Sequence, residues 1–291
     1  MKYTYYPGCS VLATAKHYQE SIDAVAGVLG IELEELDDWN CCGATANMSE
    51  KELMSFAISA RNLALAEKFH RDLVTPCSAC FTVLNKTNQY FAEYPDLRKK
   101  LGQTLEAAGL SYSGNIRVRH ILDIVVNDVG NEKLASLVKR RLEGLKVAPY
   151  YGCQIVRPGT DFDDPDDPQC MDRLIEALGA TAVEYSMKAK CCGASLMGTQ
   201  ENLALRLCKN LLLEAERNEA DCVITLCPLC QMNLDVYQRK VNRHFGTKFN
   251  IPVLYFTQLI GLALGIPSGK LGFRRLAIKS TEPLRKFMSG A

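Results

Sequence analysis

The sequence lacks the long apolar run and the one-sided charge that would place it in a membrane or on nucleic acid. Its longest apolar stretch, residues 254–266, is interrupted by Thr257 and Gln258 and is shorter than the roughly 20 residues that a membrane-spanning helix needs. Lys and Arg number 34 against 33 for Asp and Glu, so no excess of charge favours nucleic acid. The N-terminal residues show no secretory signal. We expect a cytoplasmic protein without a transmembrane segment.

Two common cofactor motifs are also missing. The glycines of residues 152–160 (GCQIVRPGT) do not form the G-x-G-x-x-G pattern that binds dinucleotides. The sequence has no C-x2-C-x2-C-x3-C-P segment of the ferredoxin type. We therefore expect neither a flavin nor a nicotinamide site in this chain, and we expect electrons to reach it from another protein.

What the sequence does contain is 13 cysteines, an odd number in a chain that is large for a disulfide-stapled scaffold. This favours metal ligation over a disulfide framework. Ten of the cysteines form one pattern twice: a single Cys, an adjacent pair followed by Gly, and a C-x-x-C. In the first half they are Cys9, Cys41, Cys42, Cys77 and Cys80, and in the second half Cys153, Cys191, Cys192, Cys227 and Cys230.

The residues around the cysteines repeat as well, and they predict the fold. Strands at 2–6 and 146–151 lead to the first cysteine of each set, and helical and strand-like segments alternate after them. Such alternation favours a parallel sheet, whose ligands lie at the carboxyl ends of the strands. We predict an α/β fold of two pseudo-symmetric repeats, domains 1–145 and 146–291, each a small parallel-sheet lobe with its cysteine loops at those strand ends.

A helix is predicted after each CC-G motif. Ser49 opens S-E-K-E, a capping-box pattern, before a helical stretch that reaches about His70. Thr199 opens the corresponding stretch of the second half. We expect Ser49 and Thr199 to cap these two helices.

The adjacent cysteines argue for a polynuclear metal centre. Neighbouring side chains project apart, so two adjacent thiolates are awkward ligands for one tetrahedral ion. Five thiolates also exceed the four that structural zinc or a cubane cluster takes. Gly43 and Gly193 would let the backbone adopt a left-handed turn or close against the cluster. Zinc in one half, or a metal-free dithiol, are the alternatives.

On these motifs the chain resembles the CCG-domain family and, within it, the B-subunit group of the heterodisulfide reductases. The resemblance implies that each five-cysteine set ligates a non-cubane [4Fe–4S] cluster. It implies an oxidoreductase of methanogenesis that cleaves the coenzyme M–coenzyme B heterodisulfide, an anionic disulfide, into two thiols, with one sulfur received at each cluster. The implied partners are a ferredoxin-like iron–sulfur subunit, through it a flavin subunit, and in some assemblies a hydrogenase.

The family leaves a second function open. The chain would then be the iron–sulfur electron-transfer subunit of another CCG complex. Lactate, glycolate and glycerol-3-phosphate oxidases, and sulfur-oxidising complexes that resemble heterodisulfide reductase, contain such subunits. The missing ferredoxin segment favours the disulfide-cleaving function over most of these.

The remaining candidates are single residues. Cysteines without a counterpart in the first half are expected to be buried structural thiols; they are Cys170, Cys208 and Cys222. The four histidines lack ligand-like spacing, although His17 lies close enough to Cys9 in sequence to be a candidate proton donor. Tyr6 and Tyr151 precede the first cysteines and are expected to pack rather than react.

Cationic groups are needed if the substrate is anionic. Three basic side chains lie beside the cysteine loops of the second half, and we expect at least one to bind substrate; they are Arg157, Lys188 and Lys190. The basic C-terminal stretch, residues 269–291, is expected to be a flexible tail, with a surface that docks a partner or binds the anionic substrate as the alternative.

Overall fold

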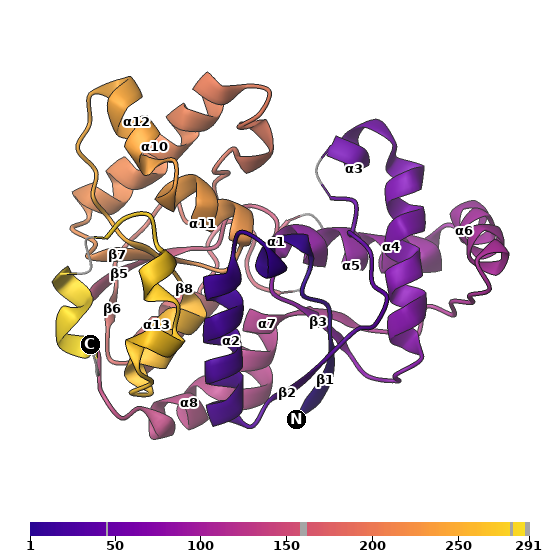
Figure 1. Cartoon of the computed structure of the whole chain (residues 1–291), viewed down its shortest axis with the longest axis horizontal. Helices are drawn as coiled ribbons and strands as arrows, with labels where there is room; N and C mark the ends of the chain where they lie inside the picture. The colour runs from indigo at the N-terminus through magenta and orange to yellow at the C-terminus, as the bar shows by residue number, and fades with distance from the viewer. Residues whose placement is uncertain (45, 158–161, 280–281, 289–291) are drawn as a thin grey trace.

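The computed structural model describes residues 1–44, 46–157, 162–279 and 282–288 (Figure 1). Residues 158–160 of the GCQIVRPGT segment lie outside this part of the chain, as does Asp161 at the start of the acidic turn. No helix within the described ranges has the length and apolar character to cross a membrane.

Two four-stranded parallel sheets form the framework of the molecule. The strand orders are β2-β1-β3-β4 in the first half and β6-β5-β7-β8 in the second. The strands are β1 (Lys2–Tyr5), β2 (Glu32–Glu35), β3 (Leu73–Thr75), β4 (Val118–His120), β5 (Lys146–Tyr150), β6 (Thr181–Ala182), β7 (Cys222–Thr225) and β8 (Val253–Tyr255). The predicted α/β fold with a parallel sheet in each half is confirmed.

Helices cover both sheets. Those of the first half are α1 (Cys9–Leu12), α2 (Lys16–Leu29), α3 (Ala46–Glu50), α4 (Glu52–Glu67), α5 (Ser78–Glu93), α6 (Pro95–Ala107), α7 (Ile121–Asp123), the π-helix η1 (Ile124–Gly130) and α8 (Asn131–Leu137). Those of the second half are α9 (Cys170–Ala177), η2 (Ala194–Leu196), α10 (Glu201–Arg217), α11 (Pro228–Asp235), α12 (Gln238–Phe245), α13 (Phe256–Ala263), η3 (Ser268–Lys270), η4 (Phe273–Arg275) and η5 (Glu282–Phe287).

Neither Ser49 nor Thr199 is the N-cap residue of its long helix. Ser49 lies inside α3, and α4 begins three residues later with Lys51 at its N-cap. In the second half α10 begins after Gln200, and neither N-cap residue accepts a side-chain hydrogen bond. The reason is that a helical turn (α3 or η2) follows each CC-G loop and moves the start of the long helix toward the C-terminus.

The two halves are joined by contacts between helices of one half and helices of the other. Helix α2 of the first half packs against α13 of the second (Figure 1). Helix α8 packs against α9. Across the first contact Tyr18 stacks on Tyr255 with ring centroids 3.8 Å apart and planes 1° apart. Ser21 Oγ and Thr257 Oγ1 lie 2.6 Å apart in the same buried contact. One continuous core therefore spans both halves, and the division into domains 1–145 and 146–291 stays a prediction.

The C-terminal stretch is packed, so the expectation of a flexible tail is wrong for residues 269–279 and 282–288. Its large apolar side chains are buried; they include Leu271, Phe273, Leu276, Leu284 and Phe287. The carboxylate of Asp235, itself buried, accepts hydrogen bonds from the amides of Ala277 at 2.7 Å and Ile278 at 3.0 Å. Residues 280–281 and 289–291 lie outside the described residues.

Candidate metal centre

All ten repeated cysteines lie in loops at, or in helices beginning near, the carboxyl ends of strands. Cys77 follows β3 and is the N-cap residue of α5, and Cys227 follows β7 and is the N-cap residue of α11. Cys80 and Cys230 lie in the first turns of these helices. Helix N-termini stabilise thiolates and other anions. The repeats therefore present each C-x-x-C where a negatively charged ligand set is favoured.

Within each half, the second cysteine of the CC pair contacts the last cysteine of the C-x-x-C. Cys42 Sγ lies 3.3 Å from Cys80 Sγ, and Cys192 Sγ lies 3.6 Å from Cys230 Sγ. The loop that carries the first cysteine also comes close. A Cβ atom added at Gly8, the residue before Cys9, would lie 3.1 Å from Cys80 Sγ. Its counterpart at Gly152 would lie 3.2 Å from Cys230 Sγ.

The two five-cysteine sets come together near Cys77 and Cys227, since Ser78, directly after Cys77, lines the cavity of the second set. Hydrogen bonds from Cys230 and then from Cys77 hold the pKa of Cys227 well below its usual value. Both side chains of this pair are buried, at 4% exposure each. Cys77 and Cys227 occupy equivalent positions in the two repeats. The pair therefore marks the centre of the pseudo-symmetric site.

Some of these thiols ionise readily because neighbouring thiols donate to them. Hydrogen bonds from Cys41 and Cys80 lower the pKa of Cys42 to about 3. The hydrogen bond from Cys153 lowers the pKa of Cys191 to about 6, and the amide of Gly193, 3.2 Å from Cys191 Sγ, acts in the same direction. Because the thiolate and not the thiol binds metal, each half holds a thiolate ligand at neutral pH.

The glycine of each CC-G motif is required by its backbone conformation and by the helix behind it. Gly43 and Gly193 have φ values of 77° and 74°, which confirms the left-handed turn expected from the sequence. A Cβ atom at Gly193 would lie 2.9 Å from Cα of Ala204 on α10, and one at Gly43 would lie 2.6 Å from Ile58 Cδ1 on α4. The close approach is thus to the following helix.

Gly193→Ala is therefore expected to displace the CC-G loop of the second half. The left-handed conformation costs a non-glycine residue about 1–2 kcal/mol, and the backbone of α10 leaves no room for the methyl group. We expect the purified variant to hold about half the iron of the wild type. Gly198→Ala is the matched control, since a Cβ there meets nothing within 4 Å. Equal iron content in both variants would contradict this account of the loop.

A cleft between the halves leads toward the second cysteine set. The outer cleft has a volume of about 680 Å³ and is lined by residues of both halves, among them Thr82, Lys86 and Thr199. An inner cavity of about 50 Å³ is lined by the second cysteine set and by Ser78 of the first half. Four residues line both spaces; they are Gln154, Ala194, Ser195 and Leu229. A small molecule entering the cleft could therefore approach the cysteines.

The cleft carries little net positive charge. Among the described residues that line it, Lys86 alone has a formal charge, and its Nζ lies 2.8 Å from Glu52 Oε1. Several lining side chains are apolar; they include Met48, Val83, Leu196 and Leu229. The lining therefore offers hydroxyl and apolar groups rather than an unneutralised cation.

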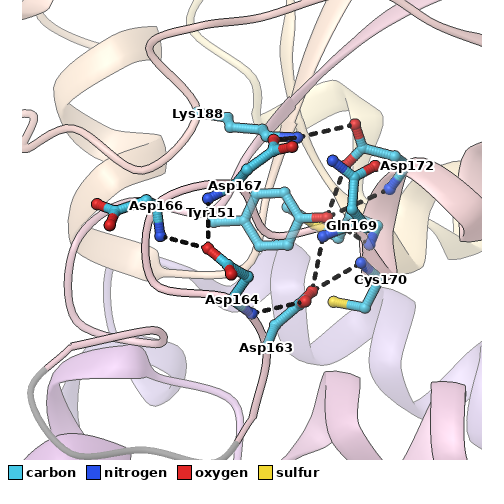
Figure 2. Close-up of polar contacts among 10 residues, drawn as sticks. Tyr151, Asp163, Asp164, Asp166, Asp167, Gln169, Cys170, Asp172 and Lys188 are labelled. Carbon is cyan, nitrogen blue, oxygen red and sulfur yellow. Dashed lines mark hydrogen bonds and ion pairs between the residues drawn. The ribbon is translucent and has the colours of Figure 1, made fainter.

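Two of the three predicted anion-binding residues are neutralised by the acidic turn of residues 162–169. Figure 2 shows Lys188 between Asp167 and Asp172, at 2.6 Å and 3.4 Å. Arg157 Nη2 lies 2.8 Å from Asp166 Oδ1. Neither side chain therefore offers a free cation to a substrate. The side chain of Lys190 is exposed, and its role in anion binding stays a prediction.

The acidic turn caps helix α9 and fixes the loop of Cys153. Asp163 Oδ2 accepts from the amides of Gln169 and Cys170, at 2.9 Å and 2.7 Å (Figure 2). The Tyr151 hydroxyl donates to Asp172 at 2.6 Å and accepts from the Met171 amide. These bonds satisfy the free N–H groups at the start of α9. As predicted, Tyr151 packs in the interior, and it also carries hydrogen bonds.

The tyrosine equivalent to Tyr6 is Tyr150. The Tyr6 hydroxyl donates to the carbonyl of Asn40 and the Tyr150 hydroxyl to that of Lys190, each at 2.8 Å. Asn40 and Lys190 immediately precede the two CC pairs. The buried tyrosines thus hold the CC-G loops against the strands that carry the first cysteines.

Of the three unrepeated cysteines, Cys208 and Cys222 are buried as expected, whereas Cys170 is only partly buried. Cys222 is buried in β7, and Cys208 is buried on α10, where its thiol donates to the Cys192 carbonyl at 3.3 Å. Cys170 begins α9 beside Asp163. His17 is buried with its ring centroid 5.0 Å from that of Tyr255, and its role as proton donor stays a prediction.

Two further buried residues near the site were not predicted from the sequence motifs. His120 ends β4 and Tyr255 ends β8, and both lie near the Cys77–Cys227 pair. They follow the equivalent segments IRVR and IPVL. Aligning the strand ends of the two repeats would have found them.

The thiol arrangement fits a polynuclear group better than a single ion. Within the described ranges, no three Cys, His, Asp or Glu side chains converge in a way that would hold one metal ion. The thiols instead lie in contacting pairs spread around the Cys77–Cys227 centre. Three buried hydroxyls within two residues of that pair have no hydrogen-bond partner among the described residues; they are Thr75, Ser78 and Thr225. A sulfide-containing anionic cluster would supply acceptors for such donors, so the residues present fit it.

Comparison with known proteins agrees with the repeat. The family model of the CCG cysteine-rich domain matches residues 3–85 and 147–235. The chain is 36% identical to the membrane anchor of the 8-methylmenaquinol:fumarate reductase of Wolinella succinogenes, over 97% of this chain and 98% of that protein. It is 31% identical to the B subunit of the ferredoxin/F420H2-dependent CoB–CoM heterodisulfide reductase of Methanosarcina acetivorans, over 98% and 96%.

A solved structure shows the same fold. The crystal structure of a hypothetical protein from Helicobacter pylori superposes with a TM-score of 0.79 at 16% identity. The match covers 95% of this chain and 52% of that one. At this identity the likeness concerns the fold alone.

Proposed function

Because the chain belongs to the CCG family of cysteine-rich domains, we propose that each five-cysteine set holds a non-cubane [4Fe–4S] cluster and that the pair reductively cleaves a disulfide. The first cluster would be held by Cys9, Cys41, Cys42, Cys77 and Cys80, and the second by Cys153, Cys191, Cys192, Cys227 and Cys230. The observation that carries the proposal is that the two cysteine sets come together at one centre, where Ser78, directly after Cys77 of the first set, lines the cavity formed by all five cysteines of the second.

The reaction needs two electrons and two protons to convert one disulfide into two thiols. Each cluster would supply one electron, so the S–S bond could break without releasing a free thiyl radical. Cys77 and Cys227 keep the two ligand sets adjacent. The residues shared by the cleft and the inner cavity, such as Gln154 and Ser195, would hold the disulfide next to the second set.

We propose the coenzyme M–coenzyme B heterodisulfide as the substrate, because several relatives are named as the B subunit of its reductase. Those names also support the expected assembly. We propose that a ferredoxin-like iron–sulfur subunit donates electrons to this chain, and that a flavin subunit lies upstream, in some assemblies with a hydrogenase. A cytoplasmic location belongs to the same proposal.

A second candidate is two-electron exchange with a quinol, in which the chain would be an electron-transfer subunit of another CCG complex. The observation that favours it is the cleft, where the one charged side chain among the described lining residues, Lys86, is paired with Glu52. Such a lining suits an apolar substrate better than an anionic one. The Wolinella succinogenes relative belongs by name to a methylmenaquinol-dependent enzyme.

One experiment separates the two candidates. The iron-loaded chain, purified without oxygen, is offered the heterodisulfide with a reduced viologen dye, and in parallel a water-soluble menaquinol analogue with an oxidised dye. The leading proposal predicts thiol release at a rate far above that of the quinol reaction. Quinol oxidation without thiol release would replace it by the second candidate.

A further inference from the structure

His120 and Tyr255 occupy the same place in the two repeats. Each is the last residue of the fourth strand of its sheet, β4 or β8. Both are fully buried, at 0% exposure. Each also carries a buried polar atom with no hydrogen-bond partner among the described residues, Nε2 of His120 and the hydroxyl of Tyr255. An unpartnered buried donor destabilises a fold, so two of them at equivalent positions call for an acceptor.

The free donor of His120 lies close to the C-x-x-C loop of the first set, because His120 pairs with Thr75 in the β3–β4 ladder, two residues before Cys77. Its Nδ1 accepts a hydrogen bond from the Leu122 amide at 3.1 Å, so the neutral ring carries its hydrogen on Nε2. Burial lowers the pKa of His120 to about 4, while the carbonyls of Pro76 and Leu226 and the charges of Cys227 and Asp123 oppose this shift. Pro76 directly precedes Cys77. The ring is therefore a neutral N–H donor beside both C-x-x-C loops.

The free donor of Tyr255 lies at the equivalent place in the second half. Its ring stacks on Tyr18, whose own hydroxyl donates to the Leu226 carbonyl at 3.2 Å. Burial raises the pKa of Tyr255 well above its usual value, and Cys227 and Cys77 raise it further. The phenol therefore keeps its hydrogen. Tyr18 has an acceptor in the chain, whereas the hydroxyl of Tyr255 has none among the described residues.

We propose that His120 Nε2 and the Tyr255 hydroxyl donate hydrogen bonds to sulfur atoms of the two clusters, and that they thereby set the clusters' reduction potentials from the protein interior. Neither residue lines the cleft or the inner cavity. Hydrogen bonds to cluster sulfurs are one of the factors that set these potentials, because they stabilise the more negative reduced state. The inference rests on cluster binding but not on the identity of the substrate. It makes His120 and Tyr255 tuning residues rather than catalytic ones.

The test is a redox titration, followed by paramagnetic resonance, of the iron-loaded chain without substrate. Tyr255→Phe removes only the hydroxyl and is expected to shift the midpoint potential of a cluster to a more negative value. His120→Leu is expected to do the same, whereas His120→Gln, which keeps an N–H donor, should restore part of the shift. Tyr18→Phe and Tyr185→Phe are the controls, since these hydroxyls donate to the carbonyls of Leu226 and Leu211.

Unchanged potentials in Tyr255→Phe and His120→Leu would overturn the proposal, as would equal shifts in the two control variants. If a variant does not assemble its clusters, the proposal is tested on the wild-type protein instead. After cluster assembly in D2O, electron–nuclear double resonance should show a deuteron coupled to a cluster, and its absence would overturn the proposal. Because the potentials are read without substrate, failure of disulfide turnover in iron-loaded protein would count against the proposed reaction alone.

Discussion

Cys41→Ser and Cys191→Ser are each expected to abolish disulfide turnover while the other half keeps its cluster. The two residues are equivalent members of the two cysteine sets, and serine is a poor substitute for a soft thiolate ligand. A single remaining cluster would deliver one electron and leave a thiyl radical, which is a high-energy product. Removing a residue that only hydrogen-bonds to a metal ligand already lowers metal affinity or activity by about 10- to 100-fold. Removing a ligand itself should have a larger effect, so we expect turnover to fall by more than about 100-fold.

Turnover is measured with an artificial reductant, and iron is determined in the same samples. Each variant should hold about half the iron of the wild type and still show one paramagnetic cluster. Cys222→Ala is the control, because Cys222 is buried in β7 away from the cysteine loops. Near-normal turnover in either serine variant would show that one cluster suffices, and its half would then have a relay or structural role.

Ser195→Trp is expected to block access to the clusters without removing them. Ser195 is exposed and lines both the outer cleft and the inner cavity. An indole there would compete with the substrate for space. Overfilling a packed site costs about 1–3 kcal/mol, so kcat/KM should fall by about 10- to 100-fold. Iron content and the paramagnetic signals should not change.

Two controls separate blocking from misfolding. Ser195→Ala tests the loss of the hydroxyl alone and should retain most of the activity. Ser111→Trp places the same side chain at an exposed position outside the cleft and should behave as the wild type. An unchanged kcat/KM in Ser195→Trp would mean that the substrate reaches the clusters by another route.

The parts of the fold that the sequence predicts are those encoded locally and repeated. The spacing of Cys41, Cys42, Cys77 and Cys80 recurs in the second half, and each C-x-x-C follows a short β-branched strand. The left-handed glycine after each CC pair is likewise a local property. Parallel sheets, strand ends and loop positions follow from such patterns.

The parts that escape prediction depend on contacts between distant residues. The stacking of Tyr18 on Tyr255 forms only because α2 of the first half packs against α13 of the second. The pairing of Lys188 with Asp167 likewise joins two separate loops. A charge near a cysteine motif in sequence therefore did not predict a charge available to substrate.

The measurement that tests the central claim most directly is the metal content of the chain. The protein is purified without oxygen and assayed for iron, acid-labile sulfide and zinc, with Mössbauer spectra of the same sample. Two [4Fe–4S] clusters predict about eight iron and eight sulfide per chain and no stoichiometric zinc. The Cys191→Ser variant should lose half of the iron and half of the sulfide. One cluster together with one zinc ion, or zinc alone, would contradict the account.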